Sequence, residues 1–357
     1  MRRSEPSASM SAGSRELLSR LAEIEDPAGA VVSVYLDTRW SDEHQRDRAR
    51  LFVAGELRRP RAGSAAGLSK DVAWIDEQVG RLVSGEAAGA AGVALFACDA
   101  RGLREMVRSR LPFADSVSVG ARPNLAPLAD VAEGAPPALI VFVDGVSARL
   151  IPLMAEGPGD EVVLEHAVEG RHRQGGWGLL AQSRYGRHIE AQRDRHYEAV
   201  ADAVLAVADA DPATRLVLAG EARAVALFRE HLPARLQARV AGAIPAARYA
   251  GVRELAEVAT ALLVRVHQRA EQEAVSAVLT DAAKGDRAVA GLARTLEALA
   301  CGAVHRLYVL YGAPLPETVI PGVIAAGGEV QVVADDPELA RAGGIAARLR
   351  WSPAERP

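Results

Sequence analysis

The segment ALIVFVDGVSARLIPL, residues 138–153, decides the fold of the central part of the chain. Two apolar runs, residues 138–143 and 146–153, stand on either side of Asp144 and Gly145. An Asp-Gly pair between apolar runs is typical of a β-hairpin turn. We therefore expect an antiparallel hairpin at this point in the chain.

Strand and helix patterns alternate downstream of the hairpin. Because such alternation is typical of α/β architecture, we expect a central α/β domain over residues 125–278. Its expected elements are strands at 161–166 and 215–218, and helices at 181–208, 222–231 and 251–283. A glycine- and arginine-rich segment, residues 170–178, precedes the first of these helices.

The sequence upstream of the hairpin predicts a separate N-terminal domain, residues 1–124. Residues 1–13 are small and polar, which favours disorder. Helices are expected at 14–24, 42–59 and 71–83, and strands at 31–36 and 92–98. Four prolines in residues 123–137 predict a linker to the central domain.

The remaining segment, residues 279–357, predicts a third α/β domain. Helices are expected at 286–300 and 317–326, and strands at 306–311, 329–333 and 343–351. Asp336 followed by Pro337 is typical of a helix start, and Gly343-Gly344 predicts a tight turn before the last strand. The expected fold class is therefore three α/β domains in series.

The cysteines and the apolar segments of the chain indicate its cellular compartment. The two cysteines, Cys98 and Cys301, lie about 200 positions apart, which excludes a disulfide scaffold and a Cys-x-x-Cys zinc site. The N-terminal residues lack the apolar segment of a signal peptide, and no apolar run reaches the roughly 20 residues of a membrane helix. A cytoplasmic protein without membrane contact is expected.

The charge of the chain is unevenly distributed. Its net charge is −4, and 40 of its 42 basic residues are arginines. Residues 171–196 contain six arginines and two acidic residues, a net charge of +4, together with His172, His188 and His196. A basic segment with a glycine-rich tip is suited to bind a folded RNA backbone. A solvated charged helix beside a flexible loop explains the same composition.

Two other interpretations of this segment fail. Residues 176–181 match a dinucleotide-binding pattern, Gly-x-Gly-x-x-Ala, but a polar segment precedes them where that motif requires a strand. Metal binding by the histidines is disfavoured because arginines crowd them and no acidic or cysteine ligand lies at suitable spacing. We therefore expect no cofactor and no metal, and no DNA partner.

Three short motifs resemble the central domain of the archaeal and eukaryotic class-1 release factors. They are Arg-His-Arg-Gln-Gly-Gly at 171–176, Arg-Tyr-Gly-Arg at 184–187 and Arg-His-Tyr at 195–197. Residues 343–351, GGIAARLRW, resemble the closing segment of that family. The resemblance covers residues 125–357. The N-terminal strand at residues 33–37, SVYLD, resembles the bacterial branch of the release factor/Pelota superfamily, which includes Balon-like ribosome-hibernation factors.

The resemblance implies an RNase H-like central domain and a C-terminal domain like the kink-turn-binding ribosomal proteins. It also implies a ribosomal partner, with the loop entering the A site and contacting ribosomal RNA. An elongation factor is a candidate second partner. The implied RNA-binding residues are Arg171, His172, Arg173, Gln174, Gly175, Gly176, Trp177, Arg184, Arg187 and His188.

One departure from the family leaves enzymatic activity open. The release factors carry a glutamine after their glycine pair, and the resemblance implies that it positions the water that attacks the peptidyl ester. This chain has Trp177 there, whose only hydrogen-bonding group is the indole N–H. Three functions follow: a non-catalytic factor that protects idle ribosomes, a peptidyl-tRNA hydrolase in ribosome rescue whose water is held by Gln182 or by backbone amides, or an RNA-binding stress adaptor away from the ribosome.

Overall fold

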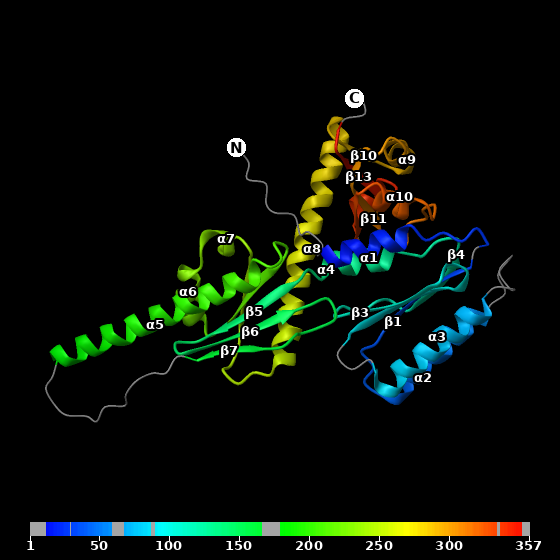
Figure 1. The fold of residues 1–357 in the computed structure, drawn as a ribbon. Helices are drawn as coiled ribbons and strands as arrows, with labels where there is room; N and C mark the ends of the chain where they lie inside the picture. The colour runs from blue at the N-terminus through cyan, green and yellow to red at the C-terminus, as the bar shows by residue number, and fades with distance from the viewer. Residues whose placement is uncertain are drawn as a thin grey trace. The chain divides into compact units, whose positions relative to one another are not determined.

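The computed structural model describes residues 12–28, 30–58, 68–86, 90–165, 179–333 and 336–351. Contacts between Cα atoms divide the chain into two compact units (Figure 1). The first unit combines Met1–Ala135 with His267–Pro357, and the second is Pro136–Val266. The chain thus leaves the first unit once and returns to it within helix α8, Val252–Lys284.

The N-terminal sheet of the first unit is antiparallel throughout, in the order β3-β2-β1-β4. Val32, Val34 and Leu36 of β1 pack on one face of the sheet, whereas Val31 and Tyr35 pack on the other, because successive side chains of a strand alternate. The strands are β1 (Val31–Asp37), β2 (Gly92–Cys98), β3 (Leu103–Ser109) and β4 (Ser116–Gly120). The helices are α1 (Ala12–Ala22), α2 (Glu43–Arg58), α3 (Ser69–Arg81), a π-helical turn (Leu82–Glu86), a 3-10 turn (Asp99–Arg101) and α4 (Ala126–Gly134).

The C-terminal sheet of the first unit has the order β10-β13-β11-β12, and only β11 and β12 pair in parallel. Its strands are β10 (Ala288–Ala290), β11 (Val304–Leu310), β12 (Glu329–Val333) and β13 (Ile345–Leu349). Its helices are α9 (Leu292–Ala300), α10 (Val319–Ala325) and α11 (Pro337–Arg341). As predicted, Asp336 caps α11: its side chain accepts hydrogen bonds from the amides of Glu338 and Leu339.

One hydrophobic core joins the N-terminal and C-terminal segments of the first unit. Helix α1 packs on α10, and α4 packs on β12. Leu21, Tyr35 and Leu125 from the N-terminal segment share this core with Leu307 and Val323 from the C-terminal segment. The two segments therefore stabilise each other.

The second unit contains a five-stranded sheet in the order β7-β6-β5-β8-β9. The predicted hairpin is confirmed as the antiparallel pair β5–β6, while β8 and β9 run parallel to β5. Numbered within this unit, the order is 3-2-1-4-5 with the second strand reversed, which is the arrangement of the RNase H-like sheet that we expected. The strands are β5 (Ala138–Val143), β6 (Ser147–Leu153), β7 (Val162–Glu165), β8 (Arg215–Gly220) and β9 (Val240–Pro245).

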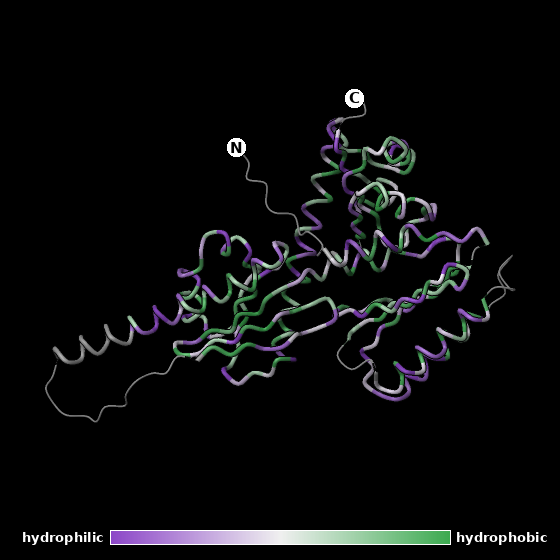
Figure 2. The backbone as a smooth tube through the Cα atoms, viewed as in Figure 1, coloured by the Kyte–Doolittle hydropathy of each residue, from purple (hydrophilic) through white to green (hydrophobic). Residues whose placement is uncertain are grey.

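Helices cover both faces of this sheet (Figure 1). Leu139 and Val141 face α5 (Leu179–Ala208), α6 (Ala222–His231) and α7 (Ala234–Gln237). Ile140 and Phe142 face the first half of α8. The central strands are therefore hydrophobic on both sides, and Figure 2 shows this concentration of apolar residues along them.

The α/β fold class is confirmed, whereas the three-domain boundaries and the likeness of the C-terminal segment to kink-turn-binding proteins stay predictions. Residues 1–11 lie outside the described residues, and α1 begins at Ala12. The linker predicted at residues 123–137 is wrong, because α4 lies within it. Pro127 stands in the first turn of α4, where its missing amide hydrogen costs nothing, so the prolines flank the helix instead of interrupting it.

The helix predicted at residues 286–300 is also wrong in its first part. Strand β10 occupies Ala288–Ala290, and Gly291 then adopts a φ of 88° before α9 begins. Three further strands, β3, β4 and β9, are absent from the expected elements. They are five to seven residues long and none is a strongly apolar run, although the Ser-Val-Ser-Val alternation of β4 is itself typical of a strand.

Candidate RNA interface

The predicted RNA-binding arm connects edge strand β7 to helix α5. Pairing places Glu165, the last residue of β7, opposite Ser147, at the edge of the sheet where β5 also ends. The segment from Arg171 to Trp177, with seven of the predicted site residues, lies outside the described residues. The sheet therefore fixes where the arm leaves the second unit.

The other predicted residues, Gln182, Arg184, Arg187 and His188, lie in the first three turns of α5, where the helical backbone is described. Positions 184, 187 and 188 are three and four residues apart, so they share one side of the helix. The helix thus places these three basic positions on one side, and all of the predicted RNA contacts stay predictions.

The second half of α5 anchors the arm. Tyr197 is 1% exposed, and Val200 and Val204 are fully buried against the sheet. The Tyr197 ring packs on Phe228 and His231 of α6, with centroid distances of 5.7 and 5.4 Å. Burial raises the pKa of the Tyr197 hydroxyl, and nearby carboxylates raise it further, so this side chain stays neutral. The helix is therefore held by its C-terminal half.

Charged residues at this anchor do not extend the predicted basic face. The carboxylate of Asp194 lies 3.7 Å from the Arg193 guanidinium and 3.8 Å from Nε2 of His231. The Arg195 Nε donates to the carbonyl oxygen of Ala191 on its own helix. His196, one of the three histidines of the basic segment, is 1% exposed and lies in the core. Arg193 is thus paired with Asp194, whereas Arg195 keeps its positive charge at an exposed position.

A hydrogen-bonded turn closes the sheet edge beside the arm. Oδ1 of Asp144 accepts from the amides of Val146 and Ser147, at 2.8 and 2.7 Å. Oδ2 of Asp144 lies 3.4 Å from Nε of Arg248, in the loop between β9 and α8. The side chain of Asp144, and not a left-handed backbone at Gly145, therefore shapes this turn.

Arg149 of β6 holds the same loop from a second direction. Its Nη1 donates to the carbonyl oxygen of Ala250 at 2.7 Å and to that of Arg248 at 3.4 Å. Its Nε donates to Glu161, and its guanidinium lies 5.8 Å from the centroid of the Phe142 ring. Sequence reasoning missed Arg149 and this loop, because nothing local distinguishes these arginines from the many others in the chain.

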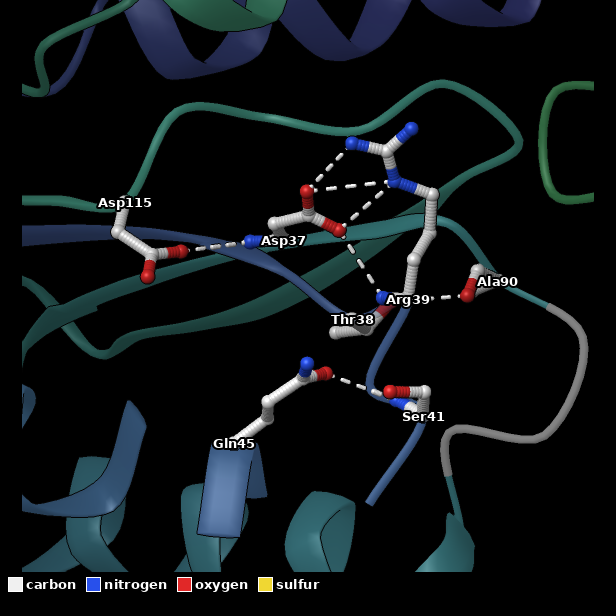
Figure 3. A network of polar contacts seen from close by, with 7 residues as sticks. All are labelled: Asp37, Thr38, Arg39, Ser41, Gln45, Ala90 and Asp115. Carbon is white, nitrogen blue, oxygen red and sulfur yellow. Dashed lines mark hydrogen bonds and ion pairs between the residues drawn. The ribbon is translucent and has the colours of Figure 1, made fainter. Parts of the chain in front are cut away.

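A separate polar network braces the loop after β1 in the first unit (Figure 3). Arg39 donates to Asp37 through Nη2 at 2.6 Å and through Nε and its backbone amide at 3.0 Å. The amide of Asp37 donates to Asp115, and the Thr38 hydroxyl donates to Ala90. Burial raises the pKa of Asp37, but the hydrogen bonds and charge of Arg39 outweigh it and leave this pKa lowered. Arg39 is therefore paired within the protein.

Within the described part of the chain, no three histidine, cysteine or acidic side chains come together as a metal site. None of its helices combines the length and apolar character needed to cross a bilayer.

A known family model matches the central segment of the chain. Residues 123–271 match the model of bacterial archaeo-eukaryotic release factor family 10. The matched segment contains α4, the five-stranded sheet, the arm and most of α8. No curated protein matches the chain.

Several solved structures resemble the chain at low identity. Archaeal translation termination factor aRF1 is 18% identical, with 98% of this chain and 100% of that chain covered and a TM-score of 0.29. Archaeal Pelota, from a ribosome-bound model with ABCE1, is 19% identical, with 98% and 99% covered and a TM-score of 0.44. Dom34 of S. cerevisiae is 12% identical, with 74% and 80% covered and a TM-score of 0.42. None of these three TM-scores reaches 0.5.

The comparisons thus make the central segment of the chain, residues 123–271, similar to the bacterial archaeo-eukaryotic release factors of family 10.

Proposed function

We propose that this protein is a cytoplasmic, ribosome-binding factor that occupies the A site and protects idle ribosomes without hydrolysing peptidyl-tRNA. The observation that carries the proposal is the family match over a segment in which Trp177 replaces the expected glutamine. The match supports a ribosomal partner, and the replacement of the glutamine by Trp177 argues against hydrolysis of peptidyl-tRNA.

The charge distribution supports an RNA contact by the arm. The net charge of +4 falls within residues 171–196, while the rest of the chain is acidic. Arginines contact phosphates through a planar fork of donors, and their number sets the salt dependence of binding. Helix α5 is anchored by Tyr197 and the residues that follow it, which leaves its basic first half to present the arm.

The chemistry of Trp177 supports a non-catalytic role. A glutamine amide both donates and accepts hydrogen bonds and can orient a water molecule. An indole only donates, but its ring stacks on an unpaired base, a contact worth about 1–3 kcal/mol. We therefore assign Trp177 to base stacking.

Binding and hydrolysis assays on bacterial 70S ribosomes test the proposal. We expect the protein to co-sediment with vacant ribosomes at low salt, and to release no peptide from ribosomes that hold peptidyl-tRNA in the P site. Trp177→Ala should weaken co-sedimentation, whereas Trp177→Phe should retain most of it. If the wild-type protein releases peptide and the Gln182→Ala variant does not, the protein is instead a peptidyl-tRNA hydrolase.

The same ribosome preparation also tests whether the protein acts away from the ribosome and whether an elongation factor delivers it. Loss of co-sedimentation at low salt, with retained binding to isolated RNA, would favour an adaptor away from the ribosome. Adding purified elongation factors tests delivery: a delivering factor should increase the rate of ribosome binding without changing the final amount bound. A cryo-EM map of the complex would locate the loop around Trp177 directly.

A further inference from the structure

Tyr249 is unusually exposed for an aromatic residue. It is 90% exposed, more than any other exposed large hydrophobic residue in the described part of the chain. It follows β9 and precedes α8, in the segment Ala246-Ala247-Arg248-Tyr249-Ala250. An aromatic ring held in water is common on surfaces that bind a partner.

The loop that carries Tyr249 is braced on both sides of this residue. Arg149 donates to the carbonyl oxygens of Arg248 and Ala250, the two neighbours of Tyr249. The amide of Ala250 donates to the carbonyl oxygen of Ala247 at 3.0 Å. The backbone at Tyr249 is thus held in place before any partner binds, which reduces the entropy lost on binding.

The loop lies at the same edge of the sheet as the base of the arm. Strands β5, β8 and β9 are parallel, so their carboxyl ends share one edge. The pairing of β6 with β5 and β7 places Ser147 and Glu165 at the same edge. Glu165 is the last described residue before the arm. The loop starts at this edge after Pro245, and Arg248 reaches Asp144 beside it.

The charge of the loop suits an anionic partner. The loop, residues 246–251, contains Arg248 and no acidic residue, and Arg253 and Glu254 follow it in the first turn of α8. Arg248 meets Asp144 through Nε, and 48% of its side chain remains exposed. An exposed aromatic ring beside arginines is the combination by which proteins bind unpaired nucleotides, with the ring on a base and the guanidinium on a phosphate.

We propose that Arg248 and Tyr249 form a second RNA contact, in which the Tyr249 ring stacks on an unpaired base of ribosomal RNA and Arg248 contacts an adjacent phosphate. This inference rests on the proposed ribosome binding. It adds a contact on a rigid loop to that made by the arm, so the two together set the orientation of the second unit on RNA.

Quantitative co-sedimentation with vacant 70S ribosomes tests this contact. Tyr249→Ala should weaken binding at least about fivefold, which corresponds to about 1 kcal/mol, and Tyr249→Trp should restore it. Tyr311→Ala is the matched control, because Tyr311 is a 50% exposed tyrosine of the first unit. Thermal unfolding should be unchanged in all three variants.

The outcomes separate the two proposals. If the wild-type protein fails to bind ribosomes, the proposed function fails and this inference with it. If the wild type binds and Tyr249→Ala binds equally well, the inference alone is overturned. A photoreactive benzoylphenylalanine at position 249 should crosslink to ribosomal RNA, whereas crosslinks only to ribosomal protein would overturn the RNA assignment.

Discussion

The ring of Tyr197 meets the ring of His231 edge to face, with centroids 5.4 Å apart and ring planes at 69°. Phe228 contacts the same tyrosine at 5.7 Å, so three aromatic rings join α5 to α6. Tyr197 belongs to the Arg-His-Tyr motif that marks the resemblance to release factors. Its place in the core explains this part of the motif by packing and not by RNA contact.

Removing this ring should destabilise the second unit. Tyr197→Ala leaves a cavity among buried residues and should lower the free energy of unfolding by about 3–5 kcal/mol, measured by urea denaturation. Tyr197→Phe keeps the ring and should cost less than about 1.5 kcal/mol. Equal losses in the two variants would show that the hydroxyl, and not the aromatic packing, holds the helix.

The basic positions of α5 should determine the salt dependence of ribosome binding. Replacing both Arg184 and Arg187 by Ala should reduce the slope of log affinity against log salt by about 1.4–1.8, if each contacts one phosphate. Arg294→Ala, an exposed arginine of α9, is the control and should leave the slope unchanged. An unchanged slope in the double variant would contradict phosphate contact by these residues.

Asp130 should give the first unit a measurable pH dependence. Its pKa is raised to about 6, because burial and then the negative charge of Glu271 raise it and His267 only partly opposes them. Because the pKa is raised in the folded state, the stabilising effect is complete below the unfolded value of 3.8 and is lost as the pH rises through about 6.

The free energy of unfolding should therefore be greater at pH 5 than at pH 7, with roughly 1 kcal/mol of the difference due to Asp130. Asp130→Asn keeps the shape of the side chain without its titration. In this variant the free energies of unfolding at pH 5 and pH 7, measured by urea denaturation, should differ by about 1 kcal/mol less than in the wild type. A difference of the same size in the wild type and in Asp130→Asn would assign the effect to other groups.

Gly220 should resist substitution, because it combines a constrained backbone with a close neighbour. Its φ is 140°, and a Cβ atom there would lie 2.4 Å from the carbonyl oxygen of Val143. Gly220→Ala should lower the free energy of unfolding by about 2–4 kcal/mol. Gly145→Ala, where a Cβ would meet no atom within 4 Å, should change it little. Equal stability of the two variants would contradict the strained geometry.

Local patterns in the sequence predicted the hairpin at Asp144, the long helix that carries the arm and the cap at Asp336, because each depends on residues close together in the chain. The shared core could not be predicted in this way. Leu21 and Val323 are about 300 residues apart, and neither carries a local sign of the other. Helix α4 was missed because its prolines resemble those of a linker, although they stand at its ends.

The candidate site was predicted from composition and motifs, which identify the arm but not the sheet edge beside it. Arg149 lies in β6, and Arg248 lies in the loop between β9 and α8, about 100 residues further along the chain. Only the fold brings the two together. Tyr249 has no neighbouring motif, so its exposure became visible only in the structure.

The core shared by the two ends of the first unit has a consequence for biosynthesis. Helices α1 and α4 of the N-terminal segment leave the ribosome long before α10 and β12, which pack on them. The second unit has a complete core within Pro136–Val266 and can fold while the rest is still being translated. A truncated nascent chain would therefore expose the sides of α1 and α4 that pack on α10 and β12 in the complete protein, which makes early termination products of this protein targets for chaperones and proteases.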